Sequence, residues 1–71
     1  MKKKFNLKKL MQGNVILTFD NKVYHVIDSK NVVLAGKIYQ LSKIEPNIRV
    51  IKSNGRDIAY RDKIGAVLYE K

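Results

Sequence analysis

Short apolar runs with alternating side chains follow one another from Val15 to the end of this 71-residue chain, each separated from the next by a short polar break. Alternation with a period of two is typical of strands that bury one face. No segment has the length and the helical period that a crossover between parallel strands would need. The sequence therefore predicts a mainly antiparallel, all-β domain.

Turn residues place the individual strands. Asn54-Gly55 tolerates positive φ at both positions and is the clearest two-residue hairpin turn in the chain. Asp20-Asn21-Lys22 predicts another turn, after a strand in which Val15, Leu17 and Phe19 share one face. The six predicted strands are Val15–Asn21, Val23–Asp28, Val32–Leu41, Ile48–Ser53, Arg56–Asp62 and Ile64–Glu70.

The longest predicted strand, Val32–Leu41, contains Gly36, where we expect a bulge or a bend. In Arg56–Asp62, Ile58 and Tyr60 share one face, and Asp57, Ala59 and Arg61 share the other. The segment Ser42–Asn47 contains the only proline and predicts a loop or a single 3₁₀ turn. These elements predict a five- or six-stranded meander or a partly open barrel, and SH3-like, Sm-like and OB-like barrels all fit this description.

Residues 1–13 are expected to form a basic N-terminal arm or a short helix ahead of a barrel domain over residues 14–71. Asn6 can cap a helical turn in which Leu7, Leu10 and Met11 share a face, and Gly13 can end it. The alternative is a flexible arm, because lysines in a first helical turn oppose the helix dipole. Phe5 would then either anchor the arm beside Leu7 and Leu10 or contact a partner.

Positive charge is concentrated at this end of the chain. Fifteen Lys and Arg residues stand against six Asp and Glu residues, a formal net charge of +9. Five of the lysines lie in the first ten residues, which contain no acid: Lys2, Lys3, Lys4, Lys8 and Lys9. Such an arm attracts polyanions, nucleic acid above all, although the same lysines would also serve solubility alone.

No residues are arranged for catalysis or metal binding. His25, the only histidine, lies in the middle of a predicted strand, where packing explains it. The chain has no cysteine, its four glycines are dispersed, and its aspartates flank predicted turns, so neither a thiolate metal site nor a phosphate-cradling loop is expected. Apolar runs such as Val32–Ala35 are too short to span a bilayer. We expect a cytoplasmic protein that is not an enzyme and has no metal, cofactor or membrane span.

Basic residues interleaved with tyrosines favour nucleic-acid binding, with RNA or single-stranded nucleic acid ahead of duplex DNA. We expect the lysines of the arm to neutralise phosphates without sequence preference. Some tyrosines must fill the margin of so small a core, which leaves at most two free to stack on bases. The predicted binding face consists of Lys37, Tyr39, Arg49, Arg56, Tyr60 and Arg61.

Two segments give the chain a resemblance to the bacterial Sm-like RNA chaperones, the Hfq family. Leu34-Ala35-Gly36-Lys37-Ile38 is similar to that family's Leu-x-Gly-x-Ile strand, and Tyr60–Val67 is similar to a later strand; the resemblance covers residues 24–68. It implies a bent five-stranded sheet in a ring-shaped oligomer that binds single-stranded RNA, with Tyr60 and Arg61 in binding positions. Asp62 stands where the family has histidine.

A second hypothesis fits the same composition. A small protein of a phage or mobile element would bind a partner protein through a strand edge or through its basic surface. Self-association is open as well, since an unpaired strand such as Ile64–Glu70 invites pairing with a second copy. The sequence leaves the inward and outward faces of the strands undecided, because one residue of register exchanges them.

Overall fold

The computed structural model describes residues 4–69, which form seven β-strands and three single-turn helical segments. The strands are β1 (Asn14–Thr18), β2 (Val23–Val26), β3 (Asn31–Leu34), β4 (Lys37–Gln40), β5 (Ile48–Ser53), β6 (Arg56–Arg61) and β7 (Val67–Tyr69). The helical segments are the 3₁₀ turns η1 (Leu7–Lys9) and η2 (Glu45–Asn47) and the short α1 (Leu41–Ile44). Every strand pairing is antiparallel. The predicted all-β antiparallel fold is thus confirmed.

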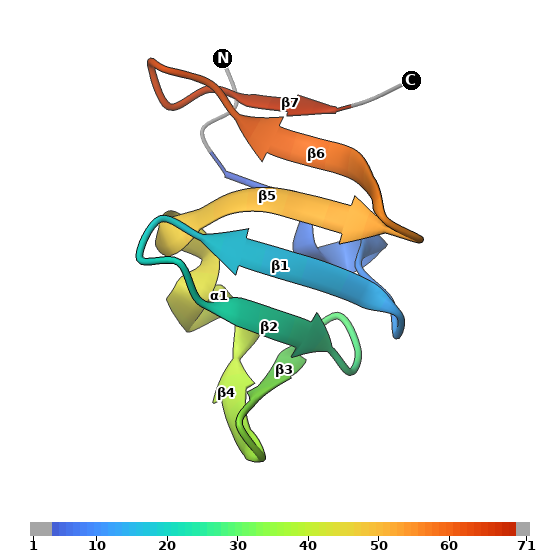
Figure 1. Cartoon of the computed structure of the whole chain (residues 1–71). Helices are drawn as coiled ribbons and strands as arrows, with labels where there is room; N and C mark the ends of the chain where they lie inside the picture. The colour runs from blue at the N-terminus through green and yellow to red at the C-terminus, as the bar shows by residue number, and fades with distance from the viewer. Residues whose placement is uncertain (1–3, 70–71) are drawn as a thin grey trace.

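The strands form one open sheet in the order β4-β3-β2-β1-β5-β6-β7 (Figure 1). β1 to β4 follow one another as a meander, and α1 and η2 then carry the chain back so that β5 pairs with the free side of β1. β6 and β7 extend the sheet from β5. The sheet therefore ends in β4 on one side and in β7 on the other.

One face of the sheet, which we call the inner face, carries the hydrophobic core. Ile16 lies opposite both Tyr24 and Ile51, and Ile51 lies opposite Ala59, so the buried side chains form a row across four neighbouring strands. The N-terminal segment, α1 and η2 cover this face, as Figure 1 shows. Side chains they contribute to the core are those of Phe5, Leu10 and Leu41.

The N-terminal segment packs as a single 3₁₀ turn rather than as a longer helix. The side chain of Asn6 accepts a hydrogen bond from the N–H of Lys8 at 3.2 Å, as the cap prediction required. Phe5 is only 4% exposed and Leu10 only 6%. From Phe5 onward the chain therefore belongs to the core rather than to a loose arm, while Lys2 and Lys3 lie outside the described residues.

The prediction of one strand over Val32–Leu41 is wrong, because this segment forms a hairpin of two strands. Ala35 and Gly36 have φ angles of 52° and 78° and form a two-residue turn between β3 and β4. Positive φ suits Gly36 but costs an alanine about 1 kcal/mol or more, which is why Ala35 gives no turn signal in the sequence. The added turn raises the strand number to seven, from the predicted five or six. Leu41, taken as the last residue of that strand, begins α1.

Two further expectations about strands need correction. The last strand begins at Val67 rather than at Ile64, because Asp62 closes a turn in which its carboxylate accepts hydrogen bonds from the N–H groups of Ile64 and Ala66. In β6 a register shift places Asp57 opposite Lys52 but Ala59 opposite Ile51. Asp57 and Ala59 consequently lie on different faces, and the intervening Ile58 packs against the core.

Candidate nucleic-acid interface

The outer face of the sheet, opposite to the core, carries an apolar row that no described segment covers. Its members are successive cross-strand partners on β2, β1, β5, β6 and β7. All are half-buried or exposed, because the structure packs its helical segments on the other face. The row consists of Val23, Leu17, Val50, Tyr60 and Leu68.

A depression of about 440 Å³ lies beside the middle of this row. It is formed by the start of β5, by β6, and by the turns that follow β1 and β6. Aromatic and basic side chains meet here on an apolar floor. The lining residues are Phe19, Arg49, Val50, Asp57, Tyr60, Arg61, Asp62 and Lys63.

Phe19 is held at the rim by the turn between β1 and β2. Its N–H donates a hydrogen bond to the carbonyl oxygen of Asn47 at 2.9 Å. The neighbouring Asp20 accepts hydrogen bonds from the hydroxyl of Thr18 and from the side-chain amide of Asn47. The bond from Thr18 is the main reason that the pKa of Asp20 lies below its ordinary value. The turn is therefore fixed, while the ring of Phe19 remains 51% exposed.

Tyr60 supplies the second aromatic ring. It lies on the outer face of β6, opposite Val50 on one side and Leu68 on the other, and is partly exposed. A half-buried ring between two apolar neighbours is fixed in position and still offers a surface to a base. Of the predicted stacking residues, Tyr60 is the one that the structure places in the depression.

Arg49 and Lys63 provide the positive charge of the depression. Pairing of Leu17 with Val50 and of Thr18 with Ile48 leaves Arg49 in a bulge, without a direct partner on β1. Both side chains are exposed, and neither forms an ion pair with an acid among residues 4–69.

The two acids of the depression are engaged elsewhere. Asp57 forms an ion pair with Lys52 at 2.7 Å. Asp62 accepts the backbone hydrogen bonds that close its own turn. Their charges are thus partly compensated, and Arg49 and Lys63 remain available to an anion.

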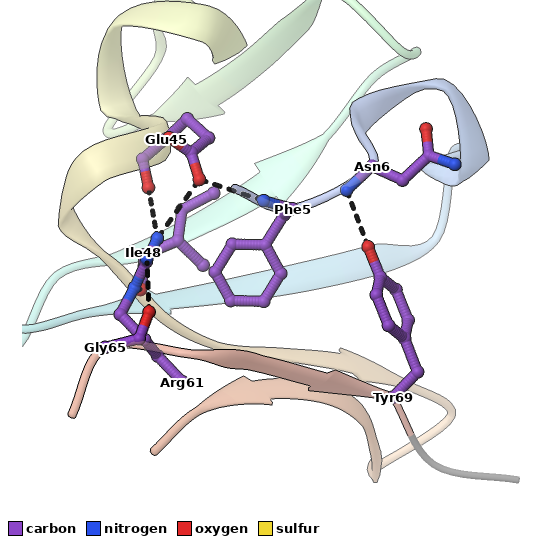
Figure 2. A network of polar contacts seen from close by, with 7 residues as sticks. All are labelled: Phe5, Asn6, Glu45, Ile48, Arg61, Gly65 and Tyr69. Carbon is purple, nitrogen blue, oxygen red and sulfur yellow. Dashed lines mark hydrogen bonds and ion pairs between the residues drawn. The ribbon is translucent and has the colours of Figure 1, made fainter. Parts of the chain in front are cut away.

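Arg61, a predicted binding residue, points into the protein instead (Figure 2). Its guanidinium lies 3.1 Å from the carboxylate of Glu45 and donates to the carbonyl oxygens of Glu45, Ile48 and Gly65. Its ring contact is with Phe5, at 4.9 Å from the ring centroid. The side chain is only 11% exposed. Arg61 therefore joins β6 to η2 and to the N-terminal segment.

The structure does not bring the remaining predicted residues to this depression. Lys37 and Tyr39 lie on β4, at the far edge of the sheet, where Tyr39 packs edge-to-face on the buried Tyr24 with the ring centroids 5.7 Å apart. Arg56 is exposed at the start of β6, beside the Asn54-Gly55 turn.

The described lysines of the N-terminal segment are on the core side of the sheet. Lys4, Lys8 and Lys9 are exposed, and the ammonium of Lys9 lies 5.4 Å from the ring centroid of Tyr69, a residue of the inner face. Lys4, Lys8 and Lys9 therefore lie on the opposite side of the sheet from the depression.

The sequence reasoning missed Phe19, Val50 and Lys63. The signal was present in β1, where Val15, Leu17 and Phe19 alternate with Ile16, so that both faces of the strand are apolar. The structure shows that Asn14, Ile16 and Thr18 are buried. The face that carries Leu17 and ends at Phe19 is the outer one.

Neither a group of metal ligands nor a membrane-spanning helix is found in the part of the chain that the structure describes. His25 is exposed on the outer face of β2, opposite Val15 and Val33. No three His, Cys, Asp or Glu side chains of residues 4–69 are grouped as metal ligands. No helix within these residues is long and apolar enough to cross a bilayer.

Comparison with known proteins found no matching family model, no matching curated protein and no matching solved structure.

Proposed function

We propose that this protein binds single-stranded nucleic acid, without enzymatic activity, at the depression on its outer face. The observation that carries the proposal is the convergence of Phe19 and Tyr60 with Arg49 and Lys63 on an uncovered apolar floor. Single-strand binding sites combine aromatic platforms for bases with cations that follow the phosphates. The net charge of +9 adds a general attraction for polyanions.

The geometry favours single strands over duplexes. Unpaired bases can leave their stack and lie on Phe19 and Tyr60, whereas the bases of a duplex expose only their edges. Reading a major groove requires an inserted helix or a two-stranded ribbon. The depression is hollowed rather than projecting, and the helices among residues 4–69 are single turns packed on the core face, so neither inserts into a groove. The projecting β3–β4 ribbon lies at the far edge of the sheet, away from the aromatic and basic side chains of the depression. RNA and single-stranded DNA both fit this chemistry.

Each part of the site has an expected contribution. Stacking on an aromatic ring is worth about 1–3 kcal/mol per base, so Phe19→Ala should weaken binding by about 5- to 150-fold. Each phosphate contact on a single strand adds roughly 0.7 to the slope of log affinity against log salt. Arg49→Gln should therefore reduce that slope by roughly 0.7, the contribution of one phosphate contact, and should weaken binding chiefly at low salt.

The test measures the affinity of labelled oligouridylate and oligothymidylate by fluorescence anisotropy over a range of salt concentrations. Met11→Ala is the matched control for Phe19→Ala, because Met11 is 63% exposed and lies outside the depression. Lys8→Gln is the control for Arg49→Gln, because Lys8 is an exposed cation of η1, the helical turn that packs on the core side of the sheet. If Phe19→Ala and Met11→Ala bind equally well, or if the unaltered chain binds neither oligonucleotide at low salt, the proposal is wrong.

A further inference from the structure

The edge strand β4 is exposed along its whole length. It pairs with β3 on one side, no strand of residues 4–69 pairs with its other side, and all four of its residues are exposed. Ile38 is 68% exposed, although it is a large apolar side chain in a regular strand. Figure 1 shows the β3–β4 hairpin extending away from the rest of the sheet.

The backbone of β4 has hydrogen-bonding capacity to spare. Leu34 and Lys37 close a two-residue hairpin, so their N–H and C=O groups face each other. Because these groups alternate in direction along an antiparallel strand, those of Tyr39 also face β3, whereas the N–H and C=O of Ile38 and the N–H of Gln40 face away. The C=O of Gln40, the N-cap of α1, accepts the first hydrogen bond of that helix. An added strand could pair with these outward groups.

The usual protection of an edge is weak here. Proline, bulges and inward-pointing charges keep edge strands from pairing. β4 has no proline and pairs with β3 without a register shift. Lys37, its single charged residue, lies next to the turn on the inner face, so it opposes an added basic strand but not an acidic one. An edge that pairs in regular register and is partly apolar is suited to strand addition.

The chain segment that contains β4 has only basic charged residues. Residues 30–44 contain three lysines, Lys30, Lys37 and Lys43, and no Asp or Glu. A second copy of this chain would bring the same lysines and the same net charge of +9 against this edge, which opposes self-pairing. A strand with acidic side chains would be attracted instead.

We propose that β4 binds an extended, acidic segment of a partner protein, which adds to the sheet as an eighth strand. The added strand would place apolar side chains beside Ile38 on the outer face of the sheet. Its intervening residues would be acidic and lie beside Lys37 on the inner face, because side chains alternate along the added strand. This surface is separate from the nucleic-acid depression, since three strands lie between β4 and β5.

The test titrates the full chain with a blocked peptide of three Glu-Val repeats and follows the backbone amides by NMR. We expect shift changes in β4 and slower hydrogen exchange at Ile38 and Gln40. A peptide of three Lys-Val repeats should not bind. Ile38→Pro removes an N–H that the β3–β4 ladder does not use, and it should lower the affinity for the acidic peptide by about tenfold. Phe19→Ala should leave this binding unchanged.

A second variant keeps the test valid if Ile38→Pro fails to fold. Lys37→Glu leaves the backbone unchanged, and it should lower the affinity for the acidic peptide and allow the basic peptide to bind. Equal affinity of the two peptides for the unaltered chain, or the absence of any change in β4, would overturn the proposal. So would a concentration-dependent dimer in light scattering that Ile38→Pro dissolves, because the occupant of the edge would then be a second copy.

Discussion

Replacing Arg61 with alanine tests the inward position of that side chain. Arg61 lies 3.1 Å from the carboxylate of Glu45, and the two side chains are only 11% and 8% exposed. The same carboxylate accepts the N–H of Phe5 at 2.9 Å. The variant would leave the charge of Glu45 buried without its cation and would remove the guanidinium from three carbonyl oxygens.

The expected loss of stability is large for a chain of this size. Removing one member of a buried ion pair costs about 3–5 kcal/mol. A domain of 71 residues has a free energy of unfolding of roughly 4–11 kcal/mol. Arg61→Ala should therefore remove between about a quarter and all of the stability. Arg61→Lys should lose less, because it keeps the charge but not the planar set of donors.

Urea denaturation followed by far-ultraviolet circular dichroism measures this loss, since the chain has no tryptophan for fluorescence. Arg56→Ala is the matched control, because Arg56 lies on the same strand, is exposed and forms no ion pair with a described acid. We expect that control to change stability by about 0.5 kcal/mol or less. If Arg61→Ala and Arg56→Ala unfold at the same urea concentration, Arg61 is not a core residue.

Two smaller predictions concern turns. Ala35→Gly should raise the free energy of unfolding by up to about 1 kcal/mol, because glycine adopts the φ of 52° without steric cost; a loss of stability in urea denaturation would contradict this assignment. The pKa of Asp28 lies below its ordinary value of 3.8, chiefly because the carboxylate accepts the N–H of Lys30, and that of Asp20 is lowered as well. A depressed pKa stabilises the folded state above the ordinary value, so stability should hold down to about pH 5 and fall below it. Asp28→Asn should make thermal unfolding less sensitive to acid, and an unchanged pH profile would count against the contribution of Asp28.

The sequence predicts the turns better than it predicts the faces. Asn54-Gly55 was placed correctly, with φ angles of 53° and 79°, because both residue types are common at positive φ. The turn at Ala35-Gly36 was missed because an alanine occupies its first position. One alanine at a positive φ, where alanine is uncommon, therefore hid the hairpin that makes β4 an edge strand.

The face on which each residue lies depends on bulges that no local sequence pattern predicts. Strict alternation correctly placed Ala59 and Arg61 on one face of β6 but added Asp57 to it. It could not say which face is inward, so Arg61 was expected to bind phosphates. In β1 the choice between Leu17 and Ile16 as the buried residue is made by the segments that pack on the sheet, Phe5 and Leu10 among them. Such long-range packing is not readable from one strand.

The binding face is tested most directly by mapping an oligonucleotide onto the chain. Backbone amide NMR spectra would be recorded during titration with oligouridylate at low salt. We expect the largest shift changes around the depression, at Phe19, Arg49, Val50, Tyr60 and Lys63, and small changes in β4 and η1. Shift changes that concentrate at Lys8 and Lys9 and leave Phe19 and Tyr60 unmoved would contradict the assignment of the outer face.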